Sequence, residues 1–203
     1  PSFSGTSDSG GTFNAKNAIN DVAELYQLVK KERVKELYYG KNVEVGEVKE
    51  VILMGMSFGS VIALLGHKDK FHKMILLSSA LLFNPKDFPT KELGKSFSNQ
   101  MKSLLSFLKT AFPHSYRIGK SSDLKDFLLG KSSLSQKKTI VSRLNDVQFP
   151  TLVLHGKDDA SVPVEIIKML EKEVSNPRIV WKYVESTHST KSYKEDAVKS
   201  ISG

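Results

Sequence analysis

Residues 55–59 read Gly-Met-Ser-Phe-Gly, and this G-x-S-x-G spacing could make Ser57 a nucleophile. The apolar run before it, residues 51–54, is typical of a buried strand, and the residues from Phe58 onward are typical of a helix. On so tight a turn the serine would hold a strained backbone conformation, and both flanking glycines would be needed because a Cβ would collide with the neighbouring strand or helix. A glycine-serine turn without chemistry is the plain alternative. The strand and helix around the motif favour the nucleophile.

A serine hydroxyl needs a base to take its proton and a carboxylate to orient that base. The loop at residues 155–163, His-Gly-Lys-Asp-Asp-Ala-Ser-Val-Pro, follows an apolar run that predicts another buried strand. The carboxyl ends of strands are where α/β proteins place their working residues. Motif spacing favours Asp159 as the acid, while Asp158 could serve instead or could help to cap the helix predicted to begin at Pro163.

Five histidines are candidates for the base, and His188 alone follows the last predicted strand in a short polar loop. There it could overhang Ser57. We interpret His67 and His72 as solvated surface groups, and His155 as a hydrogen-bonded structural group at the end of a buried strand. His114 could contact substrate, although a surface position suits it better.

Strands and helices alternate along most of the chain, which predicts an α/β fold with a mostly parallel sheet covered by helices on both faces. The predicted strands are residues 51–54, 74–77, 151–154 and 179–184. The predicted helices are residues 18–31, 58–65, 163–174 and 192–201. Pro163 would occupy the first helical turn, where its missing N–H has no partner to lose.

The stretch from Leu82 to Asn145 breaks this alternation, and we interpret it as a helical insertion between core parts 1–81 and 146–203. Its central region predicts one amphipathic helix, with lysines recurring at positions 95, 102 and 109. Its apolar stripe comprises Phe97, Met101, Leu104, Leu105, Leu108 and Phe112. The insertion has 12 Lys and Arg against 4 Asp and Glu, so it carries the whole excess positive charge.

The composition excludes several classes of function. The 203 residues include no cysteine, which rules out disulfides and thiolate catalysis. No apolar run approaches the roughly 18 to 20 residues that cross a bilayer, so we expect a soluble protein, with the cytoplasm as the default location. The net charge of +8 could suit a nucleic-acid partner, but the basic segment interleaves few aromatics and has no recognised binding motif.

These residues together resemble the α/β-hydrolase fold family, in particular its cap-bearing esterases and lipase-like members. The chain order Ser57, Asp159, His188 matches the family's nucleophile, acid and histidine, and residues 155–163 are similar to its H-G-x-x-D-x-x-V-P segment. The insertion falls where the family places its cap. Residues 5–8, Gly-Thr-Ser-Asp, look like the G-x-S-D after the family's fourth strand. The resemblance implies a nucleophile elbow at Ser57 and no cofactor or metal.

The family's first four strands have no counterpart in the sequence, nor has the loop that supplies one oxyanion-hole N–H. The N–H of Phe58 would be the other donor. The inner edge of the predicted nucleophile strand would therefore have no partner strand. Either the sequence is a fragment of a longer hydrolase, or a natural chain covers this edge by strand swapping or dimerisation, and we favour the fragment.

The expected activity is hydrolysis of a carboxylic ester through an acyl-enzyme. The same triad serves thioesterases, amidases and peptidases, and a non-catalytic hydrolase-like binding module is the alternative from another class. In the insertion, Phe97, Met101, Leu104 and Leu108 are candidates to line an acyl-chain pocket, with the lysines attracting an anionic substrate group or a lipid surface. The stripe could instead simply pack on the core, with the lysines as a solvated face.

Overall fold

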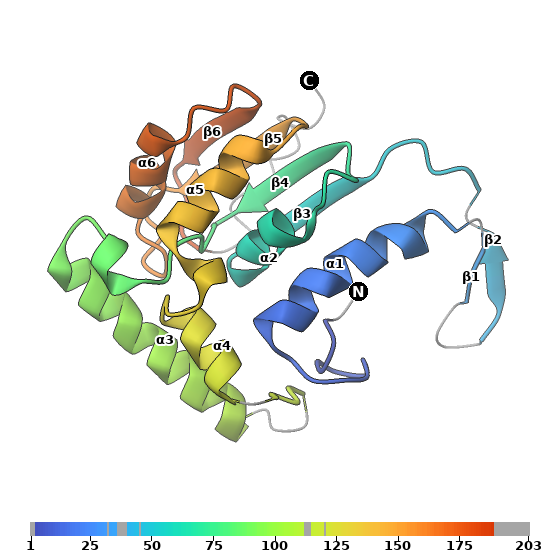
Figure 1. The fold of residues 1–203 in the computed structure, drawn as a ribbon, viewed down its shortest axis with the longest axis horizontal. Coiled ribbons are helices and arrows are strands. Elements are labelled where there is room, and N and C mark those ends of the chain that lie inside the picture. Colours follow the sequence, from blue (N-terminus) through green and yellow to red (C-terminus); the bar gives the residue numbers. More distant parts are fainter. Residues whose placement is uncertain are drawn as a thin grey trace.

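A computed structural model describes residues 3–31, 33–35, 40–44, 46–111, 115–119 and 121–188. Its main sheet has four parallel strands in the order β3 (Ile52–Met56), β4 (Lys73–Leu77), β5 (Thr151–Gly156) and β6 (Ile179–Val184), as Figure 1 shows. All four strands predicted from the sequence are present, and the mostly parallel α/β fold is confirmed. Parallel pairing brings the carboxyl ends of the strands to one edge of the sheet.

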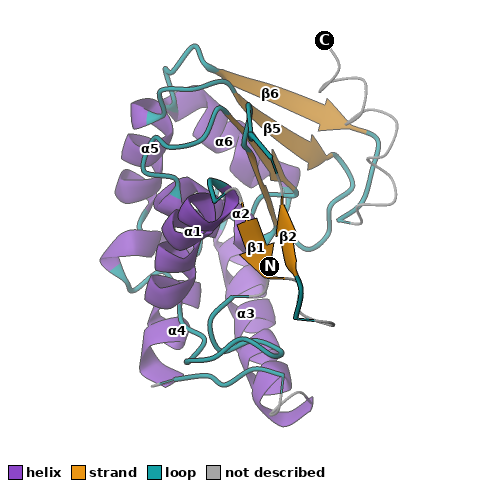
Figure 2. Cartoon of the chain, turned by 90° about the vertical axis from the view of Figure 1, so that its right-hand side faces the viewer, coloured by secondary structure: helices purple, strands orange, loops and turns teal. Residues whose placement is uncertain are grey.

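Four helices lie on one side of this sheet: α1 (Ala15–Val29), α2 (Phe58–Gly66), α5 (Lys137–Asp146) and α6 (Val164–Glu173) (Figure 2). They form one core with the strand residues that face them, including Leu53, Leu76 and Val153. In α2 every residue from Ser60 to Gly66 is buried, which explains why its sequence is apolar all round. This helix begins directly after Ser57, so the core fixes the element that carries the candidate nucleophile.

The opposite face of the sheet carries a second, smaller apolar cluster. Ile75, Leu77, Leu154 and Val184 are buried there. Ile52, Met54 and Val180 are exposed, by 38%, 56% and 59% of their surface. The predicted helix at residues 192–201 lies outside the described residues.

Residues 82–145, which the sequence analysis interprets as an insertion, are largely helical in their described part. They contain α3 (Lys91–Ala111), α4 (Ser121–Leu128), α5 and two short 3-10 turns, η1 (Pro85–Asp87) and η2 (Ser133–Ser135). On α3 the buried face includes Phe97 and Leu105, whereas Leu104 is 38% exposed. Phe112 lies outside the described residues. At the other end of the insertion, α5 packs against α2.

Three features differ from the sequence prediction. The helix α1 begins at Ala15, not at residue 18, because the side chain of Asn14 accepts a hydrogen bond from the N–H of Asn17 and caps the helix. Pro163 flanks α6 as its N-cap and is not in the first turn. The short antiparallel strands β1 (Arg33–Lys35) and β2 (Asn42–Glu44) were not predicted.

The start of the chain packs against the insertion. The N–H of Arg117 donates to the carbonyl of Gly5 at 2.7 Å, and the N–H of Ser7 donates to Ser115 at 2.9 Å. Gly5 has φ of 77°, and a Cβ there would lie 2.0 Å from the nitrogen of Phe13, so this turn requires glycine. None of the helices in the described ranges is long and apolar enough to span a membrane.

Candidate active site

Ser57 occupies a tight turn between β3 and α2, with φ of 51° and ψ of −121°. A non-glycine residue rarely adopts such a conformation, and strained residues of this kind cluster at functional sites. A Cβ on Gly55 would lie 2.4 Å from the carbonyl oxygen of Gly59, which confirms that Gly55 must be glycine. The prediction for Gly59 was wrong, because a Cβ there would meet no atom within 4 Å apart from its own helix and adjacent residues.

The backbone of Ser57 is hydrogen-bonded on one side to the last residue of β4 and on the other to the loop after it. Its N–H donates to the carbonyl of Leu77 at 2.9 Å, and its carbonyl accepts from the N–H of Ala80 at 3.2 Å. The hydroxyl of Ser60 adds a bond to the carbonyl of Gly55 at 3.0 Å. The sequence did not reveal this support, since nothing in the residue types of the loop after β4 distinguishes it from an ordinary turn.

Asp159 lies in the loop after β5, which we call the acid loop (residues 157–163). Its side chain is fully buried, and Oδ1 accepts hydrogen bonds from the N–H groups of Ser161 at 2.9 Å and Val162 at 2.8 Å. Asp158, the alternative acid, is exposed. Its N–H donates to the carbonyl of Ser186 and so helps to hold the loop that follows β6.

His188 lies in that loop and pairs with Asp159. Its Nδ1 is 2.8 Å from Oδ2 and 3.0 Å from Oδ1 of the carboxylate. Burial by itself would raise the pKa of Asp159, but the hydrogen bonds from His188 and Val162 outweigh it and leave the pKa below its ordinary value. An ionised carboxylate can only accept, so Nδ1 of His188 carries a proton; in a neutral ring the lone pair would then be on Nε2.

Ser57, Asp159 and His188 thus all follow strands of the same sheet at its carboxyl edge. The hydroxyl of Ser78, one residue beyond the carbonyl that binds Ser57, lies 3.5 Å from the backbone oxygen of His188. Among the residues that the structure describes, the side chain of Ser57 makes no hydrogen bond to His188. The structure therefore pairs the predicted acid with the predicted base and places the predicted nucleophile at the same edge.

Solved structures of low sequence identity share this architecture. An esterase from Exiguobacterium antarcticum is 19% identical with a TM-score of 0.58, over 99% of this chain and 80% of its own. The Paleococcus ferrophilus monoacylglycerol lipase is 16% identical with a TM-score of 0.56, over 97% and 78%. The chain has the α/β-hydrolase fold. A thioesterase domain from the curacin biosynthetic pathway has it too, at 14% identity and a TM-score of 0.51, over 99% and 78%.

No family model matches the sequence, and no curated protein matches it. The relationship is therefore visible in the fold and not in overall sequence. The fold says where this architecture can place a site, but it does not choose the reaction.

Phe58 follows Ser57 in this α/β-hydrolase fold and begins α2, so its N–H belongs to the first turn, where no intrahelical acceptor exists. Its ring packs edge-on against three others. The centroid of the Phe58 ring lies 6.1 Å from that of Phe13, 6.5 Å from that of Phe83 and 5.8 Å from that of Phe127. These aromatic contacts join the chain start and the insertion to the residue beside Ser57, and they were not predicted.

The remaining histidines differ in their surroundings. His155 is buried and hydrogen-bonded, which confirms its interpretation as a structural group. His72 is exposed, as predicted. The prediction for His67 was wrong: it is only 4% exposed, because it packs edge-on against Phe149 while its Nδ1 accepts from the N–H of Asp69. His114 lies outside the described residues.

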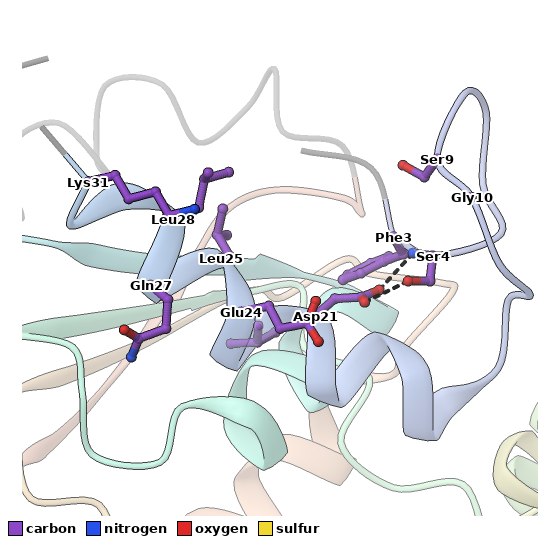
Figure 3. Close-up of a pocket in the computed structure, with 11 residues that line it drawn as sticks. Phe3, Ser4, Ser9, Gly10, Asp21, Glu24, Leu25, Gln27, Leu28 and Lys31 are labelled. Atoms are coloured by element: carbon purple, nitrogen blue, oxygen red, sulfur yellow. Dashed lines mark hydrogen bonds between the residues drawn. The ribbon is translucent and has the colours of Figure 1, made fainter. Parts of the chain in front are cut away.

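Two surface hollows lie beside elements described above, one at α3 and one at α1. One of about 560 Å³ adjoins α3 and is lined by Pro85, Lys86, Phe88, Lys91, Lys95, Ser98, Asn99 and Lys102. Another of about 480 Å³ lies between α1 and the start of the chain (Figure 3). There Ser4 donates from its N–H and its hydroxyl to Asp21, at 2.7 Å each. None of the predicted site residues lines this second hollow. In the described ranges, no three His, Cys, Asp or Glu side chains form a group that could hold a metal ion.

Proposed function

We propose that this protein hydrolyses carboxylic esters through an acyl-enzyme formed on Ser57. The observation that carries the proposal is the buried Asp159 bound to Nδ1 of His188, at the same sheet edge as a serine held in a strained turn. Acyl transfer requires a hydrogen-bonded acid and base within reach of a serine that can attack.

The reaction would run in two steps. Nε2 of His188 takes the proton of Ser57 as Oγ attacks the ester carbonyl carbon, and the tetrahedral intermediate expels the alcohol, which receives that proton. Water then attacks the acyl-enzyme with His188 again accepting and returning a proton. The N–H of Phe58 would stabilise the oxyanion in both steps. Asp159 would keep Nδ1 protonated and so keep Nε2 available.

The named activities of the structural neighbours support an ester-type substrate, since they include an esterase, a lipase and a thioesterase domain. Thioester, amide and peptide bonds remain alternatives for the same triad. A non-catalytic binding module remains the alternative of another class. The cytoplasmic location expected from the sequence stays a prediction.

We further propose that the segment 82–145 acts as a cap that binds the substrate. Phe97, Met101, Leu104 and Leu108 on α3 would contact the acyl chain. Four lysines line one hollow beside this helix, and none of the described residues in its lining is a carboxylate. This concentration of positive charge favours substrates that carry an anionic group.

The edge of β3 that faces away from β4, called its inner edge above, pairs with no other strand in the described part of the chain. We propose that this edge takes a further strand, either from a longer native protein or from a second copy, and that the second oxyanion donor comes with it. Sedimentation of the purified protein separates the two sources, because only pairing between copies doubles the mass.

Labelling with a fluorophosphonate probe tests the proposed nucleophile without requiring knowledge of the substrate. We expect the wild type to be labelled and Ser57→Ala to remain unlabelled, while Ser78→Ala, a change of the neighbouring serine, keeps its label. Turnover of p-nitrophenyl, thioester and anilide substrates then ranks the bond types. A folded wild type that neither labels nor turns over any of them would favour the binding module.

A further inference from the structure

His155 has both ring nitrogens engaged although its side chain is fully buried. Nδ1 lies 3.2 Å from the N–H of Ser79, and Nε2 lies 2.8 Å from the carbonyl oxygen of Val162. The N–H can only donate and the carbonyl can only accept, so the ring must be neutral, with its proton on Nε2. Burial, the largest influence, lowers the pKa of His155, which agrees with a neutral ring.

The bond from Nε2 reaches Asp159 through a single residue, Val162. The carbonyl of Val162 binds His155, while the N–H of the same residue donates to Oδ1 of Asp159 at 2.8 Å. The other carboxylate oxygen lies 2.8 Å from His188. Nε2 of His155 also lies 3.6 Å from that oxygen, which adds a direct electrostatic contact.

The bond from Nδ1 reaches the nucleophile in a similar way. Ser79 stands between Leu77 and Ala80, whose peptide groups bind the N–H and the carbonyl of Ser57. Ser79 is fully buried, so its backbone N–H needs a partner inside the protein, and His155 supplies it. One imidazole therefore joins the loop that supports Ser57 to the loop that holds Asp159.

We propose that His155 is a positioning residue, which sets the acid loop and the support of Ser57 relative to each other through its two ring nitrogens. It touches no reacting atom and acts through Val162 and Ser79. The inference rests on the proposed function, since its consequence is the correct placement of Asp159 and His188 for attack by Ser57. A misplacement of about 1 Å can cost on the order of a hundredfold in rate.

Two substitutions of His155 each remove one of its two hydrogen bonds, to Val162 or to Ser79. His155→Asn keeps an acceptor near the position of Nδ1 but loses the donor to Val162, and His155→Gln keeps a donor near Nε2 but loses the acceptor for Ser79. We expect kcat on a p-nitrophenyl ester to fall roughly a hundredfold in His155→Asn and about tenfold in His155→Gln, with KM within about twofold. Partial rescue by Gln over Asn would identify the Val162 bond as the stronger constraint.

His67 provides the matched control, because it is a second buried histidine with a lowered pKa and a backbone N–H bound to Nδ1. His67→Asn and His67→Gln should lower the melting temperature as the His155 variants do, yet leave kcat within about twofold of the wild type. If the His155 variants fold and also keep wild-type kcat, the residue is merely structural and the proposal is wrong.

Proton NMR distinguishes failure of this inference from failure of the proposed function. The Nδ1 proton of His188 is bound to a carboxylate, so it should give a far-downfield resonance in the wild type and in Ser57→Ala. This resonance should be absent in His155→Asn. This signal does not depend on turnover. Nitrogen-15 shifts of the wild type report the His155 tautomer directly, and a proton found on its Nδ1 would overturn the proposal even if no His155 variant folds.

Discussion

The two halves of the candidate site are held in place by different means. Ser57 is fixed by main chain, with a left-handed φ, a glycine in close approach, and backbone bonds to Leu77 and Ala80. Asp159 and His188 are fixed by side-chain hydrogen bonds between loops that lie about thirty residues apart in sequence. The main-chain support of Ser57 should therefore tolerate changes of side chain, whereas the pairing of Asp159 with His188 should not. The same support should be disrupted when a Cβ is added where the backbones approach closely.

The largest effect should come from removing the proposed nucleophile itself. Ser57→Ala should reduce ester hydrolysis by about 10⁴-fold or more, because no neighbouring group replaces the attacking oxygen. The melting temperature should barely change, since the turn is held by main-chain bonds that alanine retains. Hydrolysis of short p-nitrophenyl esters and thermal unfolding measure the two quantities. Similar esterase rates in both proteins would remove Ser57 from the nucleophile role.

In the acid–histidine half, Asp159→Asn should lower kcat by about 10⁴-fold, because an amide can no longer hold His188 in the required tautomer. Asp158→Asn is the matched control. Its exposed side chain makes no hydrogen bond to another described residue, so we expect kcat to stay within about twofold. A reversal of these two effects would transfer the acid role to Asp158.

The backbone half should respond instead to a Cβ in the wrong place. Gly55→Ala should reduce the free energy of unfolding by about 1 to 3 kcal/mol, because the added carbon would lie 2.4 Å from the carbonyl of Gly59. Gly59→Ala is the opposite case. Its Cβ enters open space in a helix, so the free energy of unfolding should stay level or rise by up to about 1 kcal/mol. Equal losses in urea unfolding would contradict the close-approach argument.

This contrast also explains what the sequence could predict. The turn at Ser57 is local, so a strand, five residues and a helix are enough to forecast it. The pairing of Asp159 with His188 joins distant segments, and it was predictable only because the order of strands and motif spacing constrained it. The linking role of His155 and the burial of His67 depend on contacts with Ser79, Val162 and Phe149 that no local pattern encodes. The open side of Gly59 was missed for the same reason.

The pH dependence of stability should come from the two buried histidines and from Asp159, and not from the main-chain support of Ser57. Burial lowers the pKa of both His155 and His67 below the ordinary 6.5, so the unfolded chain binds more protons as pH falls. Stability should therefore be complete above about pH 6.5 and decline below it, until the lowered pKa values are reached. A second decline, below the ordinary 3.8 of aspartate, should follow as Asp159 is protonated. Urea unfolding across this range should give a shallower first decline in His155→Gln and in His67→Gln than in the wild type.

The smallest effect should come from the segment 82–145, which lies outside both halves. If the lysines beside α3 attract an anionic substrate group, kcat/KM for an anionic ester should exceed that for a neutral ester of equal chain length by about tenfold at low salt. A Debye length of about 10 Å at 0.1 M means that this advantage should fade as salt rises.

Two triple variants with the same net charge separate the effect of the lysines in the hollow from the effect of overall charge. Replacing Lys91, Lys95 and Lys102 by Gln removes three of the four cations that line it. Replacing Lys109, Lys125 and Lys138 by Gln removes the same charge from outside its lining. Only the first variant should lose the salt-dependent preference for the anionic ester. Electrostatic attraction of the substrate at short range depends on the positions of the charges and not on the net charge. Identical salt profiles in both variants and the wild type would leave α3 as a packing element whose lysines are a solvated face.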